Sequence, residues 1–136
     1  MAHLMDIEVV AVDHNVYSGQ AVSVTIPGAD GYFGVLSGHA PIIASLGVGM
    51  ITIVPLTGQP VVLAVSGGFA EVVNDHVTIL AETAEMAEQI DIERARLAVD
   101  RARARLIGVE EGADLDRARA ALLRALNRLR VAGYRS

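Results

Sequence analysis

The positive charge of this chain is confined to its last third. All 11 basic residues are arginines, and the first of them is Arg94. Residues 1–86 contain eight acidic residues and no Lys or Arg, whereas residues 87–136 contain eight acidic residues and all 11 arginines. The formal charges of these two segments are therefore −8 and +3, which add to the net −5 of the chain. This division predicts two parts with different tasks, residues 1–86 and residues 87–136.

The first part has the pattern of short β-strands separated by turns. Apolar residues alternate along residues 4–12, and β-branched runs follow at residues 21–26, 49–54, 61–65, 69–73 and 77–80. Small and turn-forming residues separate these runs, and we expect turns at residues 66–68 and 74–75. Strands of this length and spacing are typical of an antiparallel β-sandwich or barrel.

The hydrophobic period changes near residue 90, where helical spacing begins. Asp91 is the expected N-cap of a first helix, and Asp114 is the expected N-cap of a second that ends at Gly133. A polar break at residues 108–113 separates them, so we predict an antiparallel two-helix hairpin and an α+β fold. Because alanine dominates the apolar stripes, the hairpin would be marginally stable unless it docks on the sandwich or on a partner.

Composition excludes several kinds of site. The absence of Cys removes disulfides, thiolate metal sites and a Cys nucleophile, and the absence of Lys removes a P-loop. The four histidines are far apart in the sequence and match no metal-binding spacing, and His39 fits a turn histidine bonded to backbone. The hairpin charge of +3 is modest for a nucleic-acid protein. We therefore predict a non-catalytic protein with no metal site, no required cofactor and no nucleic-acid partner.

The chain also lacks the apolar runs of a membrane span. No run reaches the roughly 18 to 20 apolar residues that a span requires. The N-terminus has no basic stretch and meets Asp6 and Glu8 early, unlike a signal peptide. The sequence therefore predicts neither a membrane-spanning helix nor a signal peptide.

Two pairs of arginines have helical spacing. Arg94 and Arg101 are seven residues apart and share a face of the first expected helix, while Arg124 and Arg128 are four apart on the second. In a closed hairpin the two faces would converge on a cluster suited to phosphate oxygens. The alternative is an ordinary solvated face on which Asp and Glu balance the arginines.

Three stretches resemble the epsilon subunit of F-type ATP synthase: GYFGVLSGHAP at residues 31–41, SGGFAEV at residues 66–72 and VTILA at residues 77–81. Their order, their spacing and the two-part layout are similar over essentially the whole chain. The resemblance implies a β-sandwich of about ten strands and a helical hairpin. It also implies a place in the central stalk, bound to the gamma subunit and the c-subunit ring at the cytoplasmic face of the membrane. The hairpin would extend toward the catalytic alpha and beta subunits and restrain ATP hydrolysis.

Some bacterial members of this family bind ATP as a regulatory ligand through an I/L-D-x-x-R-A motif, which residues 90–95 resemble. By that resemblance Ile90 and Asp91 would lie at the adenine end, with Glu85 nearby, and four arginines would line the phosphates. The implied nucleotide site comprises Glu85, Ile90, Asp91, Arg94, Ala95, Arg101, Arg124 and Arg128.

The resemblance also implies a surface for contact with the c-subunit ring, at Tyr32, Ser37 and His39. Tyr32 stands where the family often has an acidic residue, and Ser37 stands where a proline is usual, so the polar details of that contact stay open. Two other interpretations remain: a free-standing nucleotide sensor outside a rotary motor, and a small sandwich hydrolase. The second would need a clustered catalytic set that this sequence does not display.

Overall fold

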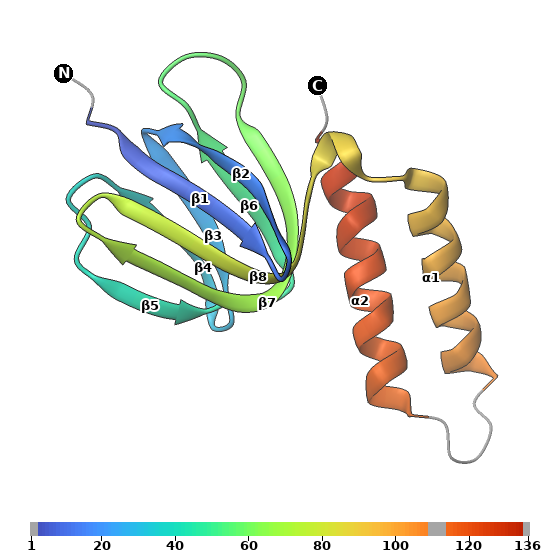
Figure 1. Ribbon diagram of the computed structural model, residues 1–136. Coiled ribbons are helices and arrows are strands. Elements are labelled where there is room, and N and C mark those ends of the chain that lie inside the picture. Colours follow the sequence, from blue (N-terminus) through green and yellow to red (C-terminus); the bar gives the residue numbers. More distant parts are fainter. Residues whose placement is uncertain (1–2, 109–113, 135–136) are drawn as a thin grey trace.

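The computed structural model describes residues 3–108 and 114–134. These residues form eight strands, then a 3₁₀ helix and two α-helices. The strands are β1 (Met5–Ala11), β2 (His14–Ala21), β3 (Ser23–Gly28), β4 (Gly31–Leu36), β5 (Ile42–Ser45), β6 (Gly49–Val54), β7 (Val61–Val73) and β8 (His76–Met86). The helices are η1 (Ala87–Gln89), α1 (Ile92–Ile107) and α2 (Leu115–Ala132). The strands stack into one body, and the two helices lie side by side at one end of it (Figure 1).

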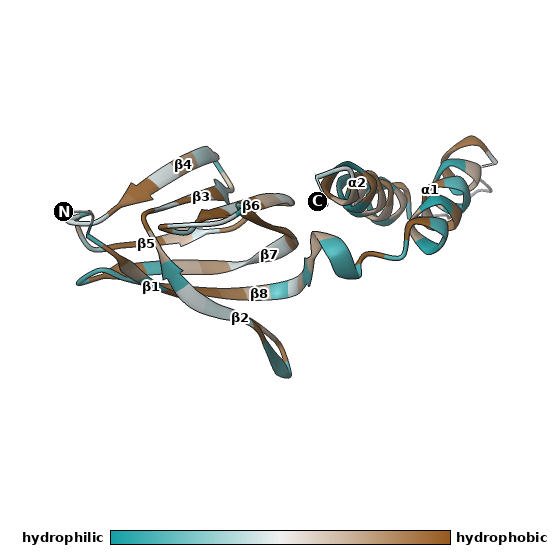
Figure 2. Ribbon diagram, turned by 90° about the horizontal axis from the view of Figure 1, so that it is seen from above, coloured by the Kyte–Doolittle hydropathy of each residue, from teal (hydrophilic) through white to brown (hydrophobic). Residues whose placement is uncertain are grey.

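The strands fold over one another in two layers. Their hydrogen-bonded order is β2-β1-β8-β7-β6-β3-β4, with β5 paired to β7. Seen from above, β3, β4 and β6 lie in one layer and β1, β2 and β8 in the other (Figure 2). Because β7 pairs with both β8 and β6, it connects the two layers. The predicted sandwich is therefore confirmed.

One turn prediction was wrong, because residues 66–68 lie inside β7. Residues 61–65 of this strand pair with β6, and residues 69–72 pair with β5. Gly67 and Gly68, between the two halves, adopt φ values of +63° and +106°. Such values suit a bend within a strand as well as a turn, because glycine has no Cβ to clash. The chain thus changes partner strand at this point without ending β7.

The strand count and the pairing also differ from expectation. The described residues form eight strands where the resemblance implied about ten, since β7 alone spans two of the expected runs over its 13 residues. Most pairs are antiparallel as predicted, but β1 and β8 run parallel, from Asp6 opposite His76 to Val10 opposite Leu80.

The sandwich encloses a core of branched aliphatic side chains. Burial alternates along β1 and β6, as expected for strands with one face toward a core. The largest fully buried side chains include Met5, Ile26, Ile51, Ile53, Leu63 and Ile79. A second, smaller cluster joins the hairpin to the sandwich and comprises Val62, Ala64, Ala87, Ile90, Val131 and Ala132.

The helical hairpin begins at the predicted caps. The carboxylate of Asp91 accepts a hydrogen bond from the backbone nitrogen of Arg94 at 3.0 Å, and that of Asp114 accepts one from Arg117 at 3.1 Å. α1 packs against α2, whereas α2 also packs against β6, β7 and η1. The helix nearer the sandwich is therefore α2 (Figure 1). Most of the expected polar break at residues 108–113 falls outside the described residues. No helix in the described part of the chain is long and apolar enough to cross a membrane.

Candidate functional site

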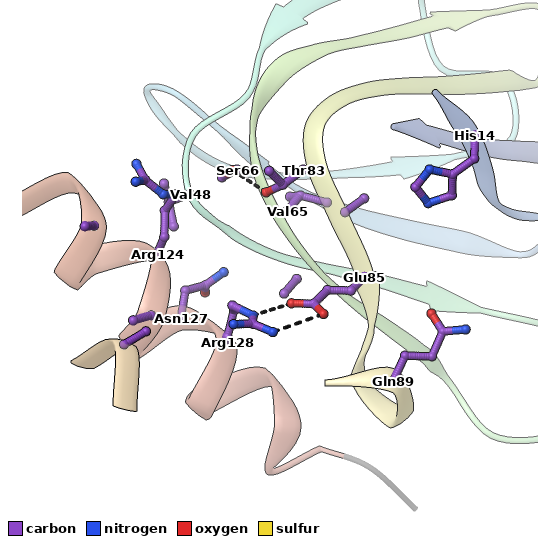
Figure 3. Close-up of a pocket in the computed structure, with 15 residues that line it drawn as sticks. His14, Val48, Val65, Ser66, Thr83, Glu85, Gln89, Arg124, Asn127 and Arg128 are labelled. Atoms are coloured by element: carbon purple, nitrogen blue, oxygen red, sulfur yellow. Dashed lines mark hydrogen bonds and ion pairs between the residues drawn. The ribbon is translucent and has the colours of Figure 1, made fainter. Parts of the chain in front are cut away.

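A cavity of about 590 Å³ lies between the hairpin and the sandwich. Its floor comes from neighbouring parts of β7 and β8, and its opposite wall comes from α2 (Figure 3). Ligand pockets of small molecules usually measure about 300 to 1,000 Å³, so this cavity has the size of a nucleotide site. The lining residues are His14, Val48, Ala64, Val65, Ser66, Thr83, Ala84, Glu85, Gln89, Ala98, Ala121, Arg124, Ala125, Asn127 and Arg128.

An ion pair between Arg128 of α2 and Glu85 of β8 crosses this cavity. The Nε of Arg128 donates to Oε1 of Glu85, and Nη2 donates to Oε2 at 3.3 Å. The two side chains are 29% and 30% exposed, respectively. Bidentate pairing of this kind fixes the geometry of both groups. The pair therefore fastens the C-terminal third of α2 to the end of the sandwich.

Arg124 lines the same cavity one helical turn before Arg128. Its side chain is exposed, and no carboxylate forms an ion pair with it among the residues that the structure describes. The cavity wall thus carries one guanidinium already engaged by Glu85 and one that is available to an anion. An arginine fork suits phosphate oxygens, which accept two hydrogen bonds side by side.

The structure brings together only part of the implied nucleotide site. Glu85, Arg124 and Arg128 line the cavity, whereas the other five residues do not belong to its lining. Ile90 is 3% exposed and packs in the smaller apolar cluster, and Ala95 is fully buried. Asp91 caps α1, while Arg94 and Arg101 are exposed. The physical reason is that α2, rather than α1, packs directly on the sandwich.

Three further polar residues line the cavity, Ser66, Thr83 and Asn127, and the sequence patterns did not indicate them. The hydroxyls of Ser66 and Thr83 are bonded to each other across β7 and β8 beside the cavity. Asn127 donates from Nδ2 to the carbonyl oxygen of Gly49 at 2.9 Å. Asparagine is unfavourable inside a helix, because its amide competes with the backbone for hydrogen bonds. The position of Asn127 within the predicted second helix was therefore a sign that its side chain has a specific partner.

The residues of the implied ring-contact surface lie at opposite ends of β4. At its start, the hydroxyl of Tyr32 accepts hydrogen bonds from the backbone nitrogen of Met50 at 3.0 Å and from Nη2 of Arg130 at 3.4 Å. Tyr32 therefore contacts α2 of the same chain, which sets it apart from Ser37 and His39.

Ser37 and His39 lie just beyond the other end of β4. The hydroxyl of Ser37 donates to Asp75 at 2.9 Å, and the backbone nitrogen of Gly38 donates to the same carboxylate at 2.8 Å. These two hydrogen bonds lower the pKa of Asp75 from its usual value, and the bond from Gly38 has the larger effect. His39 donates from Nδ1 to the carbonyl oxygen of Ala40 at 2.6 Å, which confirms the expected backbone bond of a turn histidine.

Comparison with known proteins places this architecture in a class, that of a β-sandwich domain followed by a domain of long α-helices. Residues 4–87 match the family model "ATP synthase, Delta/Epsilon chain, beta-sandwich domain". Residues 88–133 match the family model "ATP synthase, Delta/Epsilon chain, long alpha-helix domain". The chain therefore belongs to the delta/epsilon chain family of ATP synthase, which confirms the resemblance seen in the sequence.

Individual relatives agree over nearly the full length. The ATP synthase epsilon chain of Nitratidesulfovibrio vulgaris is 47% identical over 133 residues, covering 98% of each chain. That of Moorella thermoacetica is 45% identical over 129 residues, covering 95% of this chain and 96% of the relative. A chain in the mitochondrial ATP synthase of Euglena gracilis, solved as OSCP/F1/c-ring, superposes with a TM-score of 0.79 at 26% identity, covering 94% of this chain and 80% of that one.

Proposed function

We propose that this chain is the epsilon subunit of an F-type ATP synthase and a non-catalytic part of its central stalk. The observation that carries this proposal is the match to epsilon chains over 98% of both chains, together with the likeness to a chain of an F1/c-ring assembly. In this role residues 1–86 bind the gamma subunit and the c-subunit ring, with Ser37 and His39 toward the ring. Association with the cytoplasmic face of the membrane is indirect, through the complex.

The hairpin, residues 87–136, regulates the motor. When docked it leaves the catalytic alpha and beta subunits free, and when extended along the gamma subunit it contacts them and restrains ATP hydrolysis. The small alanine-rich interface supports this role, because an arm held by few contacts moves between two states at moderate free-energy cost. The arginines are then available to acidic surfaces of the catalytic subunits.

ATP is the proposed regulatory ligand of the docked hairpin. Arg124 holds its phosphates in the cavity together with Arg128, which the phosphates release from Glu85. The freed Glu85 carboxylate then supplies an acceptor for the exocyclic amine of the base. Ile90 and Asp91, just before α1, and Arg94, Ala95 and Arg101 of α1 complete the site once the ligand brings this segment round to the cavity. A ligand that binds only the docked state stabilises it by about 2.7 kcal/mol at a hundredfold excess over Kd.

Isothermal titration of the full chain with ATP tests the nucleotide site. The wild type is expected to bind, and the double variant Arg124→Ala with Arg128→Ala is expected to lose binding. Arg117→Ala with Arg119→Ala is the matched control, because it removes the same charge from α2 at residues that do not line the cavity. Equal affinity in the cavity variant and the control would remove ATP from the proposal.

Co-purification tests the rotor assignment separately. A tagged full-length chain expressed with the gamma subunit should be recovered with it. A free-standing nucleotide sensor would instead bind ATP but leave gamma behind. The two experiments thus fail independently.

A further inference from the structure

Asn127 occupies an unusual place in the hairpin. It lies inside α2 and is only 7% exposed, which makes it one of two buried polar residues among those that the structure describes. Its Nδ2 donates to the carbonyl oxygen of Gly49, at the first residue of β6, at 2.9 Å. An amide buried without a partner is strongly unfavourable, so this hydrogen bond ties the burial of α2 to one point on the sandwich.

The same point on the sandwich is bonded a second time. The backbone nitrogen of Met50, which belongs to the same peptide group as the Gly49 carbonyl, donates to the hydroxyl of Tyr32 at 3.0 Å. Arg130 joins the two halves, because its Nη2 donates to Oδ1 of Asn127 at 3.1 Å and to the Tyr32 hydroxyl at 3.4 Å. The hydrogen bonds therefore close a ring around a single peptide group.

Glycine at position 49 is what permits this approach. A Cβ at that position would lie 2.5 Å from the Cβ of Pro27 and 2.6 Å from the hydroxyl of Tyr32. Contacts this short do not occur between such atoms, so a side chain at position 49 would displace Tyr32. The ring of hydrogen bonds thus joins two strands of the sandwich, β4 and β6, to α2.

We propose that Tyr32, Asn127, Arg130 and the Gly49–Met50 peptide group form a latch that holds the hairpin on the sandwich without any nucleotide. We call these groups the α2 latch. Asn127 also lines the cavity, whereas Tyr32 and Arg130 do not, so part of the latch lies outside any site for a ligand bound there. Undocking breaks the two hydrogen bonds that cross from α2 to the sandwich, from Asn127 to Gly49 and from Arg130 to Tyr32. The other two, from Arg130 to Asn127 within α2 and from Met50 to Tyr32 within the sandwich, hold the groups of each side in position for both crossing bonds. The latch therefore opens as a unit, and it sets the resting position of the regulatory arm.

Energy transfer within the full chain measures the docked fraction directly. Because the chain has no cysteine, Ser45→Cys on β5 and Arg119→Cys on α2 accept a donor and an acceptor dye without other changes. Single-molecule measurements are made with no nucleotide present. Asn127→Ala should lower the ratio of docked to undocked molecules roughly tenfold or more, because it leaves the Gly49 carbonyl unpaired wherever α2 remains docked. Tyr32→Phe, which removes one hydroxyl, should lower it by about two- to fivefold.

Two controls separate the latch from general destabilisation. Alanine favours helix more than asparagine does, so Asn127→Ala strengthens the isolated helix and cannot undock it by melting it. Tyr17→Phe on β2 removes a tyrosine hydroxyl outside the latch and should leave the docked fraction unchanged. The two latch substitutions combined should have less than the product of their separate effects, since both act through Arg130.

A direct signature comes from proton exchange observed by NMR in the wild type. The side-chain amide protons of Asn127 and the backbone amide proton of Met50 should exchange slowly, and Tyr32→Phe should speed both. A docked fraction that is the same in the wild type and in Asn127→Ala would overturn the latch. So would undocking by Asn127→Ala with no response to Tyr32→Phe, because the ring would then not act as a unit.

Discussion

The two parts of this molecule bury very different side chains. The sandwich interior is filled by branched aliphatic residues such as Ile51, Ile53 and Leu63, all fully buried. The buried residues of the hairpin are mostly alanines, among them Ala102 and Ala118. Since each buried CH₂ contributes only about 0.8 kcal/mol, a leucine or isoleucine stabilises far more than an alanine at an equivalent place. The difference shows how one chain combines a body held by packing with an arm that is free to leave it.

The interface between α2 and the sandwich differs from both parts, because it combines a small apolar cluster with polar contacts. A small apolar cluster around Val131, the Glu85–Arg128 ion pair and the α2 latch hold α2 on the sandwich. Polar contacts are specific in geometry but contribute only about 0.5 to 1.5 kcal/mol net per hydrogen bond, because water offers the same groups other partners. An interface of this kind defines one docked position and still allows release. Four substitutions test this contrast between the sandwich and the hairpin.

The largest effect is expected from Ile79→Ala in the sandwich core. Ile79 is fully buried on β8, so truncation leaves a cavity and should lower the free energy of unfolding by about 2 to 5 kcal/mol. Urea denaturation followed by circular dichroism measures the change. Leu80→Ala is the matched control, because Leu80 is the next residue of the strand and is 54% exposed. Equal losses in the two variants would contradict a tightly packed body.

A smaller but still large effect is expected from Gly68→Ala in β7. This residue has a φ of +106°, and a Cβ there would lie 2.0 Å from the carbonyl oxygen of Leu80. A non-glycine residue with such a φ lowers the free energy of unfolding by about 1 to 3 kcal/mol, and the clash with Leu80 adds to this loss. Gly58→Ala isolates the strain, since Gly58 has a φ of +96° with open space around its Cβ position. If the two variants had the same free energy of unfolding, the close approach of β7 and β8 at Gly68 would make no contribution to the loss of stability.

Val131→Ala should weaken the interface between α2 and the sandwich while the body stays intact. Val131 is fully buried in the small cluster beneath α2, and losing two methyl groups there should shift docking by about 1 to 2 kcal/mol. Trypsin reports this selectively, because every Lys or Arg of the chain lies at or after Arg94. Faster cleavage with an unchanged unfolding transition of the sandwich is expected. Leu123→Ala, at a residue that is 56% exposed, should be cleaved at the wild-type rate.

The local parts of the fold were predictable, because their signals are short in range. Asp91 and Asp114 cap the two helices as expected. Each carboxylate bonds to a backbone nitrogen only three residues later, so the cap depends on neighbouring residues alone. The pairing of strands depends on distant residues instead. The glycines at positions 67 and 68 fit a turn or a bend equally well by sequence, and only the partners β5 and β6 decide between the two.

The candidate site was predictable to the same limited extent. Four-residue spacing correctly placed Arg124 and Arg128 on one face of α2, where both line the cavity. Spacing does not tell which of two helices lies against the sandwich, so the exposure of Arg94 and Arg101 on α1 could not be foreseen. Asn127 was missed because its partner, the carbonyl of Gly49, is 78 residues away in sequence.

The smallest effect concerns a polar contact of the sandwich at the end away from the hairpin. Bonds from the backbone nitrogen of Gly38 and the hydroxyl of Ser37 hold the pKa of Asp75 below 3.8. Because the folded pKa is lower than the unfolded one, the stabilisation is complete above the unfolded value. It is lost as the pH falls through the folded pKa. Acid below about pH 4 should therefore weaken this contact, and neutral pH should not.

Ser37→Ala separates this contact from the packing of the body. It should raise the pKa of Asp75 toward 3.8, as followed by NMR of the carboxyl carbon, because one of the two donors is lost. The pKa of Asp13 is lowered by His14 instead, so it should stay unchanged and serves as the internal control. An Asp75 pKa that did not respond would mean that the Gly38 bond alone accounts for it. If Ser37→Ala clearly lowered the free energy of unfolding at neutral pH, the contrast between sandwich and hairpin would be wrong. An exposed polar contact would then stabilise the sandwich as much as its aliphatic core does.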